Sequence, residues 1–137
     1  TRFVDDDTQD FLTEMTNEIM AMGPYFRAVV DSFDFFMQRE DPSRVVAMLR
    51  MMQAHTQLNR GILFITVSND TITPAIKQEM AAIADMVCDF KVRTVGSDFE
   101  TSMIVSKFRN APENLSIMVY RVTPEEGITP ETVERIA

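Results

Sequence analysis

Hydrophobic and polar positions follow two successive rhythms along this chain. Up to about Asp85, apolar residues recur every three to four positions, the spacing of amphipathic helices, and short continuous apolar runs separate these stretches. From Met86 onward the apolar period falls to two, which is typical of half-buried strands. The order predicts helices that alternate with buried parallel strands, followed by antiparallel strands, in a single α/β domain over residues 1–137.

The helical stretches carry start signals at their N-termini. The predicted helices are Asp7–Met22, Asp41–Asn59 and a third that starts at Thr73-Pro74 and carries Ile76, Met80 and Ile83 on its inner face. Asp5–Asp7 and Asp41 are expected to cap the first two, because a carboxylate accepts hydrogen bonds from free amides in a first turn. Met15, Met48, Met52 and Met80 fall on the predicted core faces, so packing explains these methionines better than a binding surface does.

The apolar runs predict two kinds of strand. Phe26–Ser32 and Gly61–Asn69 are short, apolar and polar at their ends, as expected of buried parallel strands. The later segments are expected to extend the same sheet as antiparallel strands. They are Met86–Thr94, Thr101–Phe108 and Leu115–Val122, and a short terminal helix is expected to start at Thr129-Pro130.

Composition narrows the class of protein. The chain has 137 residues and a formal net charge of −8, a field that repels phosphate backbones and disfavours nucleic acid as a partner. The single cysteine, Cys88, excludes an internal disulfide and fits a reducing compartment. No apolar run approaches the roughly 20 residues of a membrane span, and the acidic first residues do not resemble a targeting signal. We therefore expect a cytoplasmic protein without a membrane anchor.

Polar side chains gather where the two buried strands end. They are Asp31, Ser32, Thr66, Ser68 and Asn69. Open α/β sheets bind ligands at the carboxyl ends of their strands, so these residues are the candidate site. A carboxylate after a buried strand, here Asp31, holds magnesium in many ATPases, directly or through water. The alternative is that Asp31 only caps the next turn.

Read together, five segments resemble the RecA superfamily, and its KaiC-like branch in particular. They are Val29-Val30-Asp31-Ser32, which resembles the Walker B strand; Gly61–Thr66, which resembles the sensor strand; Ala84-Asp85-Met86-Val87; Met103–Ala111; and Tyr120–Ile128. Their order and spacing agree with the family from about Phe3 to Ile128. The resemblance implies a RecA-like three-layer sheet, truncated at its N-terminal side, and a nucleotide site for ATP and magnesium. The alternative is that this chain by itself binds no cofactor.

The same resemblance implies roles for individual residues. Asp31 matches the magnesium-associated acid and Ser32 the hydroxyl beside it, while Thr66 ends the sensor-like strand. Lys107 and Arg109 match basic residues that reach the nucleotide of a neighbouring subunit in hexameric members. Paired cations on alternate strand positions would suit a triphosphate. The alternative for Lys107 and Arg109 is solvated cover on an edge strand.

The family's phosphate-binding loop has no counterpart in this sequence. That loop requires Gly-x-x-x-x-Gly-Lys-Ser/Thr, since its glycines let backbone amides surround the phosphates. The glycines here are Gly23, Gly61, Gly96 and Gly127, and lysine follows none of them. We therefore expect no ATPase activity from this chain unless another segment supplies a phosphate loop.

Two functions remain open at this point. The chain is either the C-terminal part of a KaiC-like ATP-binding domain with a signalling or regulatory role, or a free-standing, non-catalytic protein-interaction module. In the second case the acidic stretch from Asp5 to Glu18 and the turn at Glu40-Asp41 would face a partner. Because the family's phosphate-loop strand is missing, either Gly61–Ser68 pairs directly with Met86–Thr94 or another chain covers the gap, so a homo-oligomer or a protein partner is expected.

Overall fold

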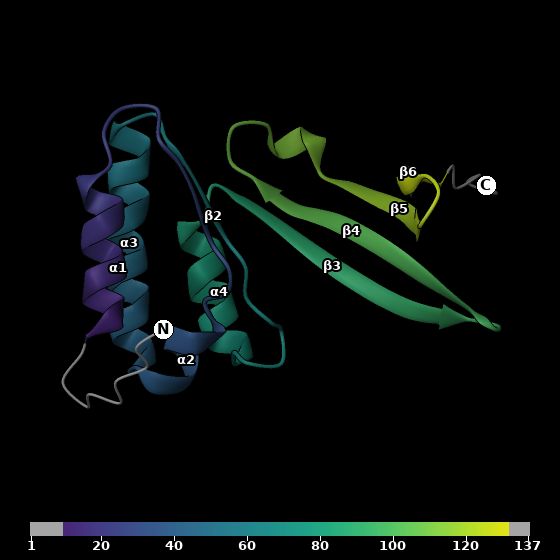
Figure 1. Cartoon of the computed structure of the whole chain (residues 1–137), viewed down its shortest axis with the longest axis horizontal. Helices are drawn as coiled ribbons and strands as arrows, with labels where there is room; N and C mark the ends of the chain where they lie inside the picture. The colour runs from purple at the N-terminus through teal and green to yellow at the C-terminus, as the bar shows by residue number, and fades with distance from the viewer. Residues whose placement is uncertain (1–9, 132–137) are drawn as a thin grey trace. The chain divides into compact units, whose positions relative to one another are not determined.

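The computed structural model describes residues 10–131 of the chain, and these residues form two compact units that divide between Ile83 and Ala84 (Figure 1). The first unit contains the helices and a parallel pair of strands. The second contains an antiparallel sheet. That residues 1–137 make one partial domain stays a prediction.

In the first unit, helices alternate with two short parallel strands. The elements are α1 (Phe11–Ala21), β1 (Arg27–Val30), α2 (Asp34–Arg39), α3 (Pro42–Leu58), β2 (Ile62–Ile65) and α4 (Pro74–Ile83). β1 and β2 pair in parallel, with Val29 opposite Phe64. Helices α1 and α3 lie side by side (Figure 1). Parallel strands joined by helices confirm the α/β class predicted from the apolar runs.

The helix starts follow from capping side chains, with one correction. Asp41 accepts a hydrogen bond from the Ser43 amide at 2.8 Å and caps α3, as predicted. The first helix was predicted to begin at Asp7, and this start is wrong. The carboxylate of Asp10 accepts a hydrogen bond from the Thr13 amide at 3.0 Å and caps the helix, so α1 begins at Phe11. Residues Asp5–Asp7, the predicted caps, lie outside the described residues. The short helix α2 was not predicted.

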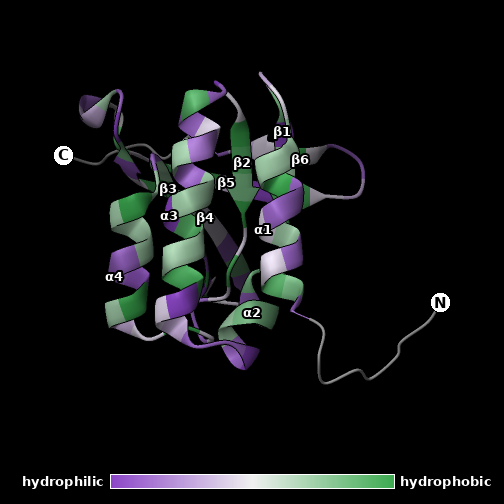
Figure 2. Ribbon diagram, turned by 90° about the vertical axis from the view of Figure 1, so that its left-hand side faces the viewer, coloured by the Kyte–Doolittle hydropathy of each residue, from purple (hydrophilic) through white to green (hydrophobic). Residues whose placement is uncertain are grey.

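The core of the first unit lies between the helices and one face of the parallel strands. Its most deeply buried side chains include Leu12, Phe33, Val45 and Met52. Met80 is buried as well, and Met15 and Met48 pack against this core, which confirms the predicted packing role of these methionines. Figure 2 shows hydrophobic and hydrophilic stretches alternating along the helices, as expected of elements with one apolar face.

The outer face of the β1–β2 pair is apolar but exposed. Ala28, Val30, Leu63 and Ile65 face the core, while the side chains between them point away from it. Val29 is 68% exposed and Phe64 is 59% exposed. Parallel sheets are usually covered on both faces, so this face is one on which further polypeptide would be expected.

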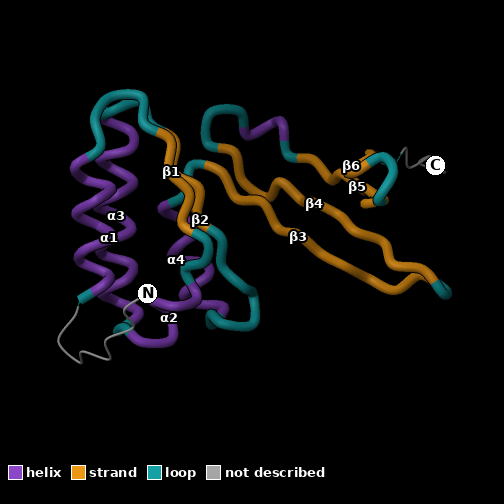
Figure 3. The backbone as a smooth tube through the Cα atoms, viewed as in Figure 1, coloured by secondary structure: helices purple, strands orange, loops and turns teal. Residues whose placement is uncertain are grey.

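The second unit is an antiparallel sheet of four strands in the order β3-β4-β5-β6 (Figure 3). Its elements are β3 (Met86–Val95), β4 (Asp98–Phe108), the 3₁₀ turn η1 (Pro112–Asn114), β5 (Ser116–Thr123) and β6 (Gly127–Pro130). The predicted terminal helix from Thr129-Pro130 is wrong at its start. Gly127 has a φ of 71° and returns the chain, so Ile128 pairs with Val122 and Thr129 and Pro130 belong to β6.

The parallel and antiparallel strands form separate sheets within residues 10–131. β2 is hydrogen-bonded to β1 alone, and β3 to β4 alone. Of the two predicted alternatives, direct pairing of Gly61–Ser68 with Met86–Thr94 is therefore wrong, and cover by another chain stays a prediction. β3 takes β4 as its partner through the tight turn after Val95, and no strand of residues 10–131 pairs with its other side.

Candidate functional site

Asp31 and Thr66 meet at the carboxyl ends of the two parallel strands. The Thr66 hydroxyl donates a hydrogen bond to Oδ1 of Asp31 at 2.5 Å. The Thr66 amide donates to the carbonyl of Val30 at 3.1 Å, so the strand pairing continues to this point and fixes the two residues side by side. Both residues are exposed, and they lie at the carboxyl ends of the strands, where α/β folds bind ligands.

Ser32 turns toward a different carboxylate. Its hydroxyl donates a hydrogen bond to Oδ2 of Asp34 at 3.1 Å, and the peptide bond that joins it to Asp31 is cis. The next amide, of Phe33, donates to the carbonyl of Thr66 at 2.8 Å. Ser32 is thus held in the loop that joins β1 to α2, next to Asp31 in sequence but bound to Asp34.

Asp34 also belongs to the candidate site at the carboxyl ends of the strands, and it was not predicted from the sequence. Its carboxylate accepts hydrogen bonds from the amide and the hydroxyl of Ser68, at 2.8 and 2.7 Å, in addition to the one from Ser32. The backbone hydrogen bond from Ser68, followed by that residue's hydroxyl, lowers the pKa of Asp34. Asp34 therefore stays ionised and ties the loop after β2 to the loop after β1. An acid in the first turn of a helix was the available signal, but α2 was not recognised.

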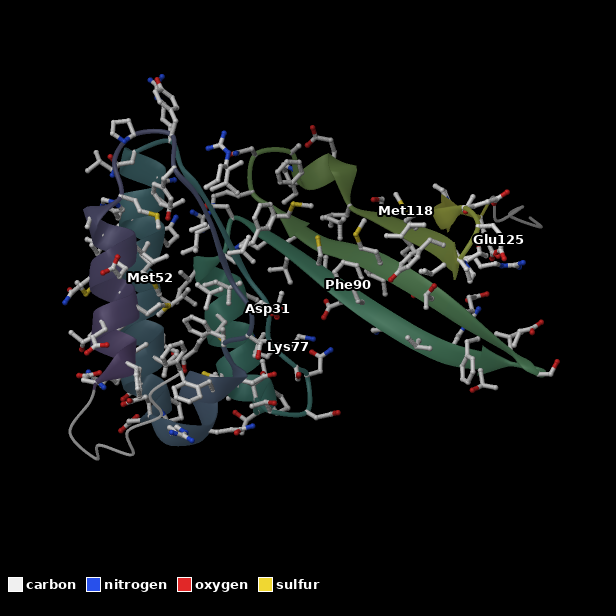
Figure 4. The ribbon with its side chains drawn as sticks, in the orientation of Figure 1. Asp31, Met52, Lys77, Phe90, Met118 and Glu125 are labelled. Atoms are coloured by element: carbon white, nitrogen blue, oxygen red, sulfur yellow. The ribbon has the colours of Figure 1, made fainter. Side chains whose placement is uncertain are left out.

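A lysine also reaches the loop that follows β2. Nζ of Lys77, on α4, donates a hydrogen bond to the side-chain oxygen of Asn69 at 2.9 Å. Asn69 was among the polar residues expected at the strand ends, whereas Lys77 was not singled out. Figure 4 labels Asp31 and Lys77, which come from the end of β1 and from α4. The first unit thus supplies a carboxylate, hydroxyls and an ammonium group from segments around these strand ends.

Lys107 and Arg109 belong to the second unit. Lys107 is in β4 opposite Val87, whereas β4 ends at Phe108 and Arg109 follows it. Arg109 is bound to Asp85 twice, by a 2.8 Å hydrogen bond from its amide to the carbonyl and by a 2.8 Å ion pair through Nη1. Arg109 thus lies one residue past the end of β4, and whether its side chain shares a face with that of Lys107 stays a prediction.

β4 lies between β3 and β5 in the sheet order, but its pairing with β5 covers Thr101 to Val105 and stops before Lys107. The alternative role of the two cations as solvated cover therefore stays a prediction too. Whether Lys107 and Arg109 reach a nucleotide stays a prediction.

The residues around Asp31 fit a magnesium ion that brings most of its own ligands. Between residues 10 and 131, no group of three or more histidine, cysteine, aspartate or glutamate side chains could hold a metal. Mg²⁺ commonly takes one or two carboxylates and completes its octahedron with water and substrate phosphates. A single carboxylate flanked by a hydroxyl matches that mode and does not match a metal cage made by protein alone.

Solved structures with the same fold define the class. The flagellar accessory protein FlaH from Methanocaldococcus jannaschii superposes with a TM-score of 0.67 at 18% identity, over 90% of this chain and 54% of that one. The KaiC-like protein PH0186 from Pyrococcus horikoshii OT3 gives a TM-score of 0.61 at 15% identity, over 89% of this chain and 53% of that one. The chain therefore has a RecA-like α/β fold of the FlaH and KaiC-like type, and it spans about half the length of these two chains.

The family follows from the sequence. The chain belongs to a family of unknown function, DUF7125, whose model matches residues 1–120. No curated protein matches it. In the part of the chain that the structure describes, no helix is both long enough and apolar enough to cross a membrane.

Proposed function

We propose that this chain is the part of a KaiC-like ATP-binding domain that carries the magnesium-associated acid and the sensor strand. The observation that carries this proposal is the hydrogen bond between Thr66 and Asp31 across the carboxyl ends of two parallel strands. In a RecA-like fold this edge is where a nucleotide would be expected. The fold of the FlaH and KaiC-like structures supports the proposal at the level of architecture.

Each polar group of this edge has a chemical role in the proposal. Asp31 accepts hydrogen bonds from the water shell of Mg²⁺ or binds the ion itself, and Thr66 keeps its carboxylate in one orientation. Ser32, held by Asp34, offers a second hydroxyl beside it. Lys77 adds a positive charge to the loop after β2, where phosphate charge would be neutralised.

The second unit would act on a neighbouring subunit. Lys107 and Arg109 are proposed to reach a nucleotide held by the next copy in an oligomer. Arg109 already has an acidic partner in Asp85, which presents its guanidinium in a defined place. Such a contact would couple nucleotide state to assembly, which is the signalling or regulatory role that we assign to the protein, in the cytoplasm.

Hydrolysis requires a further segment in this proposal. The sequence has no Gly-x-x-x-x-Gly-Lys-Ser/Thr, so the amides that surround the phosphates must come from elsewhere in the same polypeptide or from another chain. Two facts support a missing portion: the match leaves nearly half of each of the two structures uncovered, and Val29, Ile62 and Phe64 on the outer face of β1–β2 are exposed. The chain of residues 1–137 then binds MgATP without hydrolysing it.

A thermal-shift experiment tests the proposal. We expect millimolar MgATP to raise the melting temperature of the 137-residue chain, since a ligand that binds the folded state stabilises it. Asp31→Asn keeps an oxygen for the Thr66 hydroxyl but removes the charge, so it should abolish the shift. Asp98→Asn, a like change of an exposed acid at the β3–β4 turn, should leave the shift intact.

Manganese locates the ion. Because Mn²⁺ broadens the NMR signals of nearby nuclei, MnATP should broaden the amide signals of Asp31, Ser32 and Thr66 first. A chain that shows no shift with MgATP, or whose shift survives in Asp31→Asn, would refute the proposal.

A further inference from the structure

Beyond the register shift between Val87 and Cys88, one face of the sheet in the second unit carries no charged side chain among its paired residues. Residues directly opposite each other in an antiparallel pair point to the same face, so the register assigns each side chain to one side of the sheet. Phe90 lies opposite Met103 and Met103 opposite Met118, which places all three on one face (Phe90 and Met118 are labelled in Figure 4). The large exposed side chains of this face, called the apolar face below, are Phe90, Val92, Phe99, Met118, Val122 and Ile128.

The opposite face of the same sheet carries the charges. Lys91 and Arg93 alternate along β3 with the side chains of the apolar face, so they point to the other side. Nη2 of Arg93 pairs with Oε1 of Glu100, its cross-strand neighbour, at 2.6 Å. An antiparallel sheet with one charged and one apolar face is typical of a sheet that is solvated on one side and covered on the other.

The apolar face is exposed over an area that suits a protein–protein contact. Its least exposed large side chain, Met118, is still 43% exposed, and Phe99 is 77% exposed. Since large side chains of this kind cover about 150–250 Å² each when bare, the six together expose roughly 700 Å². Monomeric proteins rarely expose apolar patches larger than about 300–600 Å², so the face has the size of an interface.

We propose that the apolar face packs against the same face of a second copy of this chain. Two sheets of this kind stack about 10 Å apart with their strands within about 30° of each other, and a twofold axis brings identical patches together. A nearly flat, uncharged sheet face is complementary to itself in such a contact. One contact therefore covers the apolar face of both copies.

Charge and area select a second copy as the occupant. The chain has a net charge of −8, so two copies repel each other unless they meet through an uncharged surface. The apolar face is such a surface, and Lys91 and Arg93 point away from it. A stable interface buries about 800 Å² on each partner, which is close to the area that this face exposes.

The contact is independent of the proposed nucleotide site. Asp31 and Thr66 belong to the first unit, whereas the apolar face belongs to the second. The dimer is therefore expected with and without MgATP, and its failure would leave the proposal of nucleotide binding untouched.

Sedimentation velocity of the 137-residue chain tests the proposal. We expect a dimer in the micromolar range that dissociates on dilution, since interfaces of this size bind at micromolar concentrations or more tightly. Val92→Lys places a charge and its symmetry mate in the contact, so it should raise the Kd of the dimer at least about tenfold. Ile128→Lys, on β6 at the same face, should have an effect of the same size.

Matched variants on the charged face control for the change in charge. Val95→Lys makes the same substitution on the same strand but on the other side of the sheet, and Ile117→Lys matches Ile128→Lys, because both isoleucines are 70% exposed. Both controls should change the Kd less than about twofold, as expected for positions outside an interface. All four substituted positions are at least 51% exposed, so each variant is expected to keep its fold, which circular dichroism checks.

Methionine methyl signals locate the contact. Met118 lies on the apolar face, whereas Met51 is a comparably exposed methionine on α3 in the first unit. In an NMR dilution series, the methyl signal of Met118 should shift as the dimer dissociates, while that of Met51 should stay in place.

A chain that stays monomeric at every soluble concentration would overturn the proposal and leave the apolar face to another polypeptide. A dimer that survives both Val92→Lys and Ile128→Lys would overturn it too, because the contact would then lie elsewhere on the chain. Equal dissociation by the variants of the two faces is the third contrary result, since the effect would then come from charge alone.

Discussion

Ser68 donates two hydrogen bonds to the carboxylate of Asp34, one from its amide at 2.8 Å and one from its hydroxyl at 2.7 Å. Asp34 begins α2 and Ser68 follows β2, so the pair joins the segments that leave the two parallel strands. Asp31 closely precedes Asp34 in sequence, and Thr66 closely precedes Ser68. The geometry of the candidate site therefore depends on a second carboxylate, that of Asp34.

Asp34→Asn should loosen this junction. The asparagine side chain has one acceptor oxygen where aspartate has two, so one of the hydrogen bonds from Ser68 or Ser32 is lost. We expect the free energy of unfolding to fall by about 1.5–3 kcal/mol, the usual contribution of a hydrogen bond to a charged group. Urea unfolding measures it, and Asp70→Asn, at an exposed acid of the same loop, is the control. Equal midpoints for the two variants would contradict the assigned role of Asp34.

Asp10 makes the stability of the first unit depend on pH in the acidic range. The hydrogen bond from the Thr13 amide, together with the Arg44 side chain, lowers the pKa of Asp10 from 3.8 to about 2. A carboxyl whose folded pKa is depressed contributes stability that is full above its unfolded value near 4 and is lost as the pH falls toward 2. We expect Asp10→Asn to lower the melting temperature at pH 6, because asparagine caps the helix but cannot pair with Arg44 as a charge.

The pH series tests this assignment by its shape. The difference in melting temperature between the wild type and Asp10→Asn should shrink steadily between about pH 4 and pH 2. A difference that stays constant down to pH 2 would mean that Asp10 titrates normally in the folded chain.

Sequence reasoning succeeded where a single local pattern carries the information. The apolar runs before Asp31 and Thr66 predicted two parallel strands and their meeting point, because a continuous apolar run with a polar end shows in consecutive residues. It missed α2, because six residues are too few to show a helical period. Because α2 was not predicted, Asp34 and its hydrogen bonds to Ser68 were not predicted either.

The errors near the C-terminus have a different cause. Thr129-Pro130 reads as a helix start, but proline is also compatible with an edge strand, and the turn at Gly127 decides in favour of pairing with β5. The sequences of β2 and β3 could not show whether these two strands pair, because pairing depends on which other strand lies beside β3. The ion pair between Arg109 and Asp85 could not be predicted either, because the two residues lie far apart in sequence.

Two neighbouring methionines on α3 test the division between core and surface. Met52 is fully buried and Met51 is 50% exposed. Met52→Ala should cost about 2–5 kcal/mol of unfolding free energy, because it removes buried contacts and leaves a cavity. Met51→Ala should change it by less than about 0.5 kcal/mol, as surface substitutions usually do. Urea unfolding of both variants checks this, and comparable losses would mean that Met51 is covered by a partner or a second copy.

The ring of Phe26 leaves no room for a side chain at Gly61. A Cβ atom at position 61 would lie 2.5 to 2.9 Å from three carbons of that ring, closer than real contacts allow. Phe26 is only 9% exposed and stacks on the ring of His55, with centroids 5.7 Å apart, so it cannot move aside without disturbing the start of β1. We expect Gly61→Ala to lower the free energy of unfolding by about 1–3 kcal/mol, the usual cost of overpacking a core.

Gly23→Ala is the matched control for this substitution, since a Cβ atom there meets nothing within 4 Å. It should leave stability unchanged or raise it slightly, by about 0.4–1 kcal/mol, because alanine restricts the unfolded chain. Thermal and urea unfolding of the two variants separate steric overlap from the general effect of replacing glycine. If Phe26→Leu restores the stability of Gly61→Ala, the ring is the group responsible; if the double variant is no more stable, the clash is with the backbone around β2 instead.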